Sequence, residues 1–237
     1  MTVGRFLRSL GFQRPEAVRE SVRDIPPHQN GAKSAPPVVA GQEAASGGPL
    51  ADTMARHIET LQTIHRMSGE YRWREAVGLI CDAEMVFVAA FHDCCGIARG
   101  FSDQLLSARG AVHYLDGQDG TYQQLLTREA DNLLLIVIDC HRLSTKSRTL
   151  ARAAKAMGHR VLFISDQDRG WTQENADVSL PVPPAPPALA NSPVALAALL
   201  DFLMISVLDA DGERARNRAQ QIVNLQDLFG EFTHGGR

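Results

Sequence analysis

The chain has 237 residues, and its 24 basic and 27 acidic side chains give a formal net charge of −3. This length fits one α/β domain of ordinary size with a small appendage. With 44% hydrophobic and 22% charged residues the composition is that of a globular protein. An isoelectric point near 6.2 excludes a strongly basic nucleic-acid coat, although a local basic element is compatible with it.

The sequence shows no signal for export or membrane insertion. Arg5 and Arg8 interrupt the apolar residues at the amino terminus, so the apolar core of a signal peptide is missing. The most apolar long stretch, 193–208, contains Asp201 and is shorter than the ~20 residues that a membrane helix needs. The 4 cysteines are therefore expected to stay reduced. We expect a cytoplasmic protein without a membrane partner.

Three segments differ in composition. Residues 1–25 have the pattern of two short helices, in which apolar residues from Val3 to Leu10 recur at helical spacing. Residues 26–50 are rich in proline, glycine, alanine and serine and lack a periodic apolar face, which predicts a flexible linker. The remaining residues, 51–237, are predicted to form the main domain.

Helical and strand patterns alternate along the main domain. The first helix is predicted to carry its apolar face on Met54, Ile58, Leu61 and Ile64, and a second helix runs to about Ala83. Short apolar runs typical of buried parallel strands follow at 85–90, 112–115, 133–138, 161–164 and 178–182. Further helices are predicted at 95–108, 122–128, 145–157, 171–175, 192–208 and 212–229.

This alternation predicts an α/β fold, a doubly wound parallel sheet of five strands with helices on both faces. In such a sheet the ligand crevice lies beyond the carboxyl ends of the strands, where the strand order reverses. For the flavodoxin-like order 2-1-3-4-5, this point lies between the first and third strands. Their outgoing loops are residues 91–96 and 139–145, and we place the candidate site there.

Three stretches of the main domain resemble the SIS (sugar isomerase) domain. The run 87–106 ends in Ala-Arg-Gly-Phe-Ser-Asp-Gln-Leu-Leu and is similar to a strand, a G-x-G-S-S loop and an A-R-D helix. The run 133–166 resembles, without a gap, the strand, S-x-S loop, helix, strand and T-D unit. The run 174–183 resembles the fifth strand with its preceding A-D. With its surrounding helices, the chain resembles the RpiR/MurR family of bacterial transcription regulators.

Residues 1–24 resemble the latter part of that family's helix-turn-helix domain, with residues 2–12 on the recognition helix. A recognition helix without the helix it packs against cannot bury its apolar face. We therefore expect the chain to start inside a longer gene product, the alternative being a protein that has lost DNA binding. On spacing alone these helices would be read as solvated. The resemblance implies DNA contacts from Thr2, Arg5, Arg8 and Arg14.

The two candidate loops depart from the SIS pattern, in which hydroxyl groups and helix N-termini hold a sugar phosphate. Asp93 stands where a serine is usual in the first loop, and Asp139 does so in the second. Like unit charges 4 Å apart cost about 4 kcal/mol at an effective dielectric near 20, so these acids oppose a phosphate. The predicted ligand-binding residues are His92, Asp93, Cys94, Asp139, His141, Ser144, Thr145 and Ser147.

The same loops hold side chains that zinc accepts. These are His92, Asp93, Cys94, Cys95, Asp139, Cys140 and His141. Their spacing matches no zinc-finger pattern and adjacent cysteines seldom point at one ion, so no metal or cofactor is predicted. A purely structural interpretation also stands, in which Asp93 caps the next helix and a cysteine packs as a small apolar group.

The leading interpretation is a transcription regulator of the RpiR type, and not an enzyme. Its SIS domain would form a homodimer or homotetramer and bind a carbohydrate derivative or a related metabolite. A ligand that prefers one dimer geometry would change the spacing of two DNA-binding heads. Two alternatives stay open. One is a sugar-phosphate isomerase-like enzyme in which Asp93, Asp139 and His141 move protons, and the other is a scaffold that keeps the fold for dimerisation.

Overall fold

The structure is a computed structural model of the whole chain. It describes Arg5, Gly11, Phe12, Ala17 and residues 48–230, except for 119, 121, 129–130, 142, 167–169 and 185–191. The chain divides into the units Met1–Ala35 and Pro36–Arg237, and the fold below is that of the second unit. The predicted amino-terminal helices and most of the predicted linker lie outside the described residues, so the predicted boundaries at 25 and 50 stay predictions.

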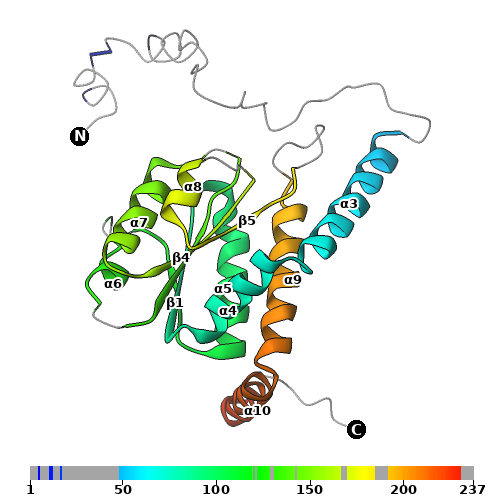
Figure 1. Cartoon of the computed structure of the whole chain (residues 1–237), viewed down its shortest axis with the longest axis vertical. Helices are drawn as coiled ribbons and strands as arrows, with labels where there is room; N and C mark the ends of the chain where they lie inside the picture. Colours follow the sequence, from blue (N-terminus) through cyan, green and yellow to red (C-terminus); the bar gives the residue numbers. More distant parts are fainter. Residues whose placement is uncertain are drawn as a thin grey trace. The chain divides into compact units, whose positions relative to one another are not determined.

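A parallel sheet of five strands forms the centre of the domain, in the order β2-β1-β3-β4-β5 (Figure 1). The strands are β1 (Met85–Ala90), β2 (Val112–Leu115), β3 (Leu133–Ile138), β4 (Arg160–Ser165) and β5 (Val178–Pro181). The predicted fold class and strand order are confirmed. The strand bounds differ from the predicted ones by no more than a residue at either end, because most strand residues are apolar and the strands lie between polar or glycine-containing turns.

Helices cover both faces of the sheet. Figure 1 shows α6, α7 and α8 on one side and α4, α5 and α9 on the other. The helices are α3 (Gly48–Met67), α4 (Tyr71–Asp82), the short 3-10 helix η1 (His92–Cys94), α5 (Cys95–Arg109), α6 (Gln123–Leu126), α7 (Thr145–Ala156), α8 (Gly170–Asn175), α9 (Val194–Ala210) and α10 (Gly212–Phe229). In the part of the chain that the structure describes, no helix is both long and apolar enough to span a bilayer.

The sheet buries side chains on both of its faces. Along β1, Val86 and Val88 pack toward α4, α5 and α9, whereas Phe87 and Ala89 pack toward α7. This alternation follows from the two-residue period of a strand. No residue of β3 is more than 1% exposed, so this central strand anchors both cores. Trp73 Nε1 donates to Ser206 Oγ at 3.0 Å and joins α4 to α9.

The apolar face predicted for α3 is not the face that packs on the domain. Met54 is 60% exposed, Ile58 46% and Leu61 40%, and of the four predicted residues only Ile64 is buried. Thr60 is buried instead, and its hydroxyl donates a hydrogen bond to the carbonyl oxygen of Arg56 at 2.9 Å. The periodicity located an apolar stripe correctly, but a period alone does not say which surface covers the stripe.

Asp177 fastens the start of β5 to β4. Its Oδ1 lies 2.8 Å from Lys155 Nζ and 3.1 Å from Arg160 Nε. Its Oδ2 accepts the backbone N–H of Val161 at 2.7 Å, and its own N–H donates to the carbonyl oxygen of Val161 at 2.8 Å. The carboxylate therefore fixes the register of the edge strand with one backbone and two charged partners.

Asp177→Ala is expected to lower the free energy of unfolding by about 1–3 kcal/mol, because the Val161 amide and two cations lose their acceptor. Asp177→Asn is the matched control. It keeps an acceptor for the amide and is expected to lose less. Urea denaturation of both variants measures the difference, and equal losses would contradict the role of Asp177 as acceptor for the Val161 amide.

Candidate functional site

The loops that leave β1, β3 and β4 begin side by side at one edge of the sheet. Ala90 pairs with Ile138 at the ends of β1 and β3. The backbone N–H of Phe91 donates to the carbonyl oxygen of Ile138 at 3.3 Å, and that of Asp139 donates to the carbonyl oxygen of Ile164 at 3.0 Å. The predicted juxtaposition of the first two loops is confirmed, and it lies at the point where the strand order reverses.

Two histidines at this edge have left-handed backbone conformations. His92 has a φ of 57° and His141 a φ of 67°. This region is unfavourable for residues with a Cβ, and a residue held there costs on the order of 1 kcal/mol or more. Glycine would occupy both positions without this cost. Two imidazoles thus stand in strained backbone positions at this edge.

Asp139 is fully buried where β3 turns into α7. Its Oδ2 accepts the backbone N–H of Ser144 at 2.6 Å and the hydroxyl of Ser147 at 2.5 Å. Its Oδ1 has no hydrogen-bond partner among the described residues. Burial raises the pKa of the Asp139 carboxyl group, and the opposing effects of the Ser147 hydroxyl and the Ser144 amide are smaller.

His141 connects the loops of three strands. Its backbone N–H donates to both carboxylate oxygens of Asp166, at 2.9 and 3.0 Å. Its Nδ1 lies 3.3 Å from Asp166 Oδ2, and its Nε2 lies 3.9 Å from Asp93 Oδ2. The imidazole is thus held between a carboxylate that follows β4 and one that follows β1. Its side chain is 19% exposed, against 47% for Asp93.

Asp166 is the residue of this cluster that sequence reasoning missed. It corresponds to the last residue of the T-D element in the SIS pattern, but it is not among the residues predicted to bind the ligand. Its position directly after β4 could have identified it, because the first residue after a parallel strand lies at the same edge as the loops of the neighbouring strands.

Cys94 is the buried last residue of η1 and follows Asp93 in the chain. Its side chain is 2% exposed and forms a hydrogen bond with the thiol of Cys140, which is equally buried. That bond, together with burial, raises the pKa of Cys140. A direct contact between the Cys94 thiol and a ligand would require η1 to move. The ligand role predicted for Cys94 stays a prediction.

The three predicted hydroxyl residues take different positions at the start of α7. Ser144 caps the helix, because its Oγ accepts the backbone N–H of Lys146 at 3.1 Å. Ser147 is buried against Asp139 and also approaches the carbonyl oxygen of Ser144, at 2.7 Å. Thr145 is exposed and is free to face solvent at the helix N-terminus.

The candidate zinc ligands divide into separate small groups. Cys94 is paired with Cys140, and His141 lies between Asp93 and Asp166. Among the described residues, no group of three or more His, Cys, Asp or Glu side chains is arranged to hold a metal ion.

The residues predicted to contact DNA are for the most part beyond the part of the chain that the structure describes. Arg5 is exposed. Thr2, Arg8 and Arg14 lie outside the described residues, so their role stays a prediction.

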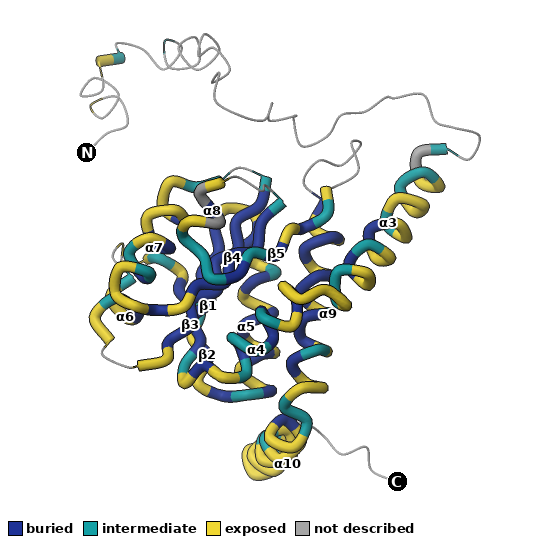
Figure 2. The backbone as a smooth tube through the Cα atoms, viewed as in Figure 1, coloured by how far each residue is buried: buried dark blue, intermediate teal, exposed yellow. Residues whose placement is uncertain are grey.

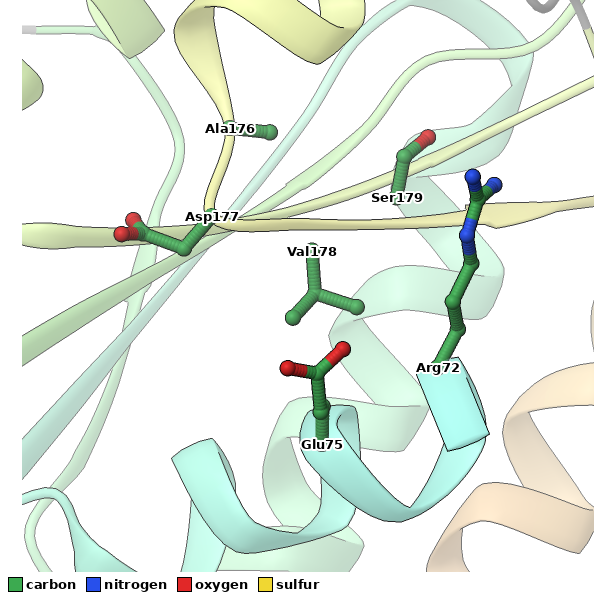
Figure 3. A pocket seen from close by; sticks show the side chains of 6 residues that line it. All are labelled: Arg72, Glu75, Ala176, Asp177, Val178 and Ser179. Atoms are coloured by element: carbon green, nitrogen blue, oxygen red, sulfur yellow. The ribbon is translucent and has the colours of Figure 1, made fainter. Parts of the chain in front are cut away.

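A hollow of about 180 Å³ lies elsewhere, between α4 and the amino end of β5 (Figure 3). Figure 3 shows the carboxylate of Asp177 turned away from Arg72 and Glu75, in keeping with its bonds to Lys155 and Arg160. This hollow lies at the opposite end of the strands from the three loops, so it does not belong to the candidate site. The residues that line it are Arg72, Glu75, Ala176, Asp177, Val178 and Ser179.

Comparison with known proteins supports the fold and leaves the function open. No protein-family model matches the chain, and no curated protein matches it. Among solved structures, the sugar isomerase domain of an RpiR transcription factor from Sphaerobacter thermophilus is 20% identical, with a TM-score of 0.66 over 74% of this chain and 98% of that one. The chain therefore has the SIS α/β fold.

Two further structures represent different functions on this fold. Vibrio vulnificus NanR in complex with ManNAc-6P is 17% identical, with a TM-score of 0.62 over 75% of this chain and 69% of that one. A Methanococcus jannaschii protein inferred to be a 3-hexulose-6-phosphate isomerase is 16% identical, with a TM-score of 0.54 over 71% and 96%. Regulators and isomerases thus share this architecture, and the fold alone does not choose between them.

The raised pKa of Asp139 makes stability depend on pH. A carboxyl group whose pKa is higher in the folded than in the unfolded protein contributes stability at pH values below the unfolded pKa, near 4. That contribution is lost as the pH rises through the folded pKa. Asp139→Asn has no such proton. Its free energy of unfolding, relative to that of the wild type, is therefore expected to rise as the pH rises through this window.

Urea denaturation at a series of pH values measures this difference. A free energy of unfolding of Asp139→Asn that falls relative to that of the wild type as the pH rises would contradict the assignment.

Proposed function

We propose that this chain is a transcription regulator of the RpiR type that works in the cytoplasm. Its SIS domain binds a carbohydrate derivative at the edge formed by the loops after β1, β3 and β4. The observation that carries the proposal is the His141 cluster, in which one imidazole lies between Asp93 and Asp166, two residues along the chain from the buried Asp139. Strained backbone and charged side chains meet there at the switch point of the sheet.

The charges of this edge favour a ligand without a phosphate. Asp93 and Asp166 stand on either side of His141, and a phosphate placed beside them would meet like charges at short range. An ammonium group would meet opposite charges at the same place. We therefore assign an amino sugar or a related cationic carbohydrate derivative as the ligand class, in contrast to the sugar phosphate named for NanR.

Sensing fits these residues better than turnover does. A general acid or base must reach the substrate with a proton that it can exchange. The His141 imidazole is held on both sides by carboxylates, and Asp139 is buried with one oxygen tied to α7. These groups position loops. Because His141 joins three loops, a ligand that moves one of them shifts the others, which suits a population shift between two forms of a dimer.

The main alternative is a scaffold that keeps the fold only for dimerisation. It is favoured by the internal pairing of Cys94 with Cys140 and of Asp139 with Ser147, since these side chains partner one another without any ligand.

A thermal-shift experiment separates the candidates. Glucosamine is expected to raise the melting temperature, and N-acetylglucosamine and glucosamine 6-phosphate are expected to raise it less. At a concentration of about 100 times Kd, a ligand adds about 2.7 kcal/mol to the free energy of unfolding. Asp93→Asn is expected to weaken glucosamine binding about tenfold, since it removes one charge from the site.

Asp103→Asn is the matched control, because Asp103 is an exposed carboxylate on α5 paired with Arg99. It is expected to bind glucosamine as the wild type does. Stabilisation by none of the sugars would favour the scaffold, and conversion of an aldose phosphate to the ketose phosphate of the same composition would overturn the proposal in favour of an isomerase.

A further inference from the structure

Helix α3 carries an apolar stripe that nothing in the described part of this chain covers. Leu50, Met54, Ile58 and Leu61 are all exposed, and Leu50 is 82% exposed. Spacings of four, four and three residues place them along one side of the helix. Figure 1 shows the first half of α3 running outward from the rest of the fold, and Figure 2 shows exposed residues along it.

Helix α9, which packs against α3, also exposes apolar side chains. Its sequence is apolar almost all the way round, and a helix of that kind is normally buried on every side. Within this chain, however, Ile205 is 58% exposed and Leu208 is 40% exposed. Two helices that contact each other thus both leave large aliphatic side chains in solvent.

The charged side chains of α3 lie on the side of the helix away from the stripe. At about 3.6 residues per turn they form a row of their own, roughly opposite Met54 and Leu61, and this row consists of Asp52, Arg56, Glu59 and Arg66. A residue close to a two-fold axis faces its own copy, so a charge there would meet a like charge. The stripe has the aliphatic Ile58 at its centre, which favours a second copy of this chain as the partner.

Two copies of α3 match each other better antiparallel than parallel. In an antiparallel pair the same flank of each helix meets, so with the two-fold axis close to Ile58, Met54 of one copy lies opposite Leu61 of the other. On the second flank, Gln62 then lies beside the small Ala55 at the edge of the contact. In a parallel pair opposite flanks would meet, and Leu61 would pack on the amide of Gln62, which is costly to bury.

The stripe is also large enough for such a contact. The residues of α3 next to it, Ala51, Ala55, Gln62 and His65, are exposed as well. Two antiparallel helices that cover these residues together with the stripe would remove on the order of 1,000 Å² from solvent, which is about the least that a specific interface needs.

We propose that α3 is the core of a homodimer interface, in which the α3 helices of two copies pack antiparallel about Ile58. The partner is a second copy of this chain, because the stripe is uncharged at its centre and pairs apolar with apolar side chains across a two-fold axis. The proposal deepens the dimer part of the proposed function and rests on it only in requiring a dimer. It makes no use of the ligand loops.

Engineered cysteines test the geometry. Under mild oxidation of the full chain, Ile58→Cys is expected to form a disulfide with itself across the axis. Met54→Cys and Leu61→Cys are expected to cross-link mainly when the two variants are mixed. Arg56→Cys is the matched control, because residue 56 is exposed on the side of α3 away from the stripe. The wild type, with its free cysteines 81, 94, 95 and 140, gives the background.

Ile58→Asp gives a second measurement that does not depend on cross-linking. The substituted side chain is exposed in the single chain, so the variant is expected to keep the wild-type circular dichroism spectrum. Sedimentation is expected to show a dimer dissociation constant raised at least about tenfold, since a charge would be buried at the axis. Arg56→Asp is expected to dimerise as the wild type does.

The outcomes are distinguishable. A dimer that survives Ile58→Asp, or equal self-linking by all three stripe variants, would overturn the antiparallel α3 interface and leave the proposed regulator intact. A wild-type monomer would overturn both the interface and the dimer part of the proposed function. Binding of a sugar would still be decided separately by the thermal-shift experiment.

Discussion

The candidate site depends on two carboxylates that replace missing backbone partners where strands end. When β3 ends, Asp139 ties the chain to the first turn of α7 through Ser144 and Ser147. When β4 ends, Asp166 captures the backbone N–H of His141 and approaches its ring. Buried polar groups need such partners, because an unmade bond there costs about 1–3 kcal/mol. The loops are therefore held by acidic side chains, and the proposed class of ligand rests on the charge of the same residues.

This arrangement separates the fold from the chemistry that the fold carries. The sheet and its helices are those of the SIS domains with which the chain compares, at identities of 20% and below. The loops that would hold a sugar phosphate in the resembling family instead present carboxylates and imidazoles. A scaffold can accept this inversion of charge, because the sheet is stabilised by aliphatic side chains beneath the loops and not by the loop residues themselves.

The sequence predicted the sheet closely because β3 is an unbroken aliphatic run and its neighbours β1 and β4 are largely apolar, a pattern typical of strands that are covered on both faces. Side-chain partners were harder to predict. The contact between Cys94 and Cys140, and the reach of Asp166 to His141, depend on strand register and loop conformation, which periodicity does not encode. The left-handed conformation of the two histidines was hidden for the same reason. Periodicity identified the apolar residues of α3, but it could not tell which side of the helix packs on the domain.

The ligand loops and the α3 stripe are joined by packed helices. Asp93 belongs to η1, which leads directly into α5, and α5 packs against α9, which packs against α3. A ligand that pulls on Asp93 therefore acts on the start of a helix whose far neighbours expose the apolar stripe. If the dimer and the ligand favour the same arrangement of these helices, each must strengthen the binding of the other by the same factor. This hypothesis requires sugar affinity to differ between the wild-type dimer and the Ile58→Asp monomer, and equal affinities by calorimetry would show that the two surfaces are independent.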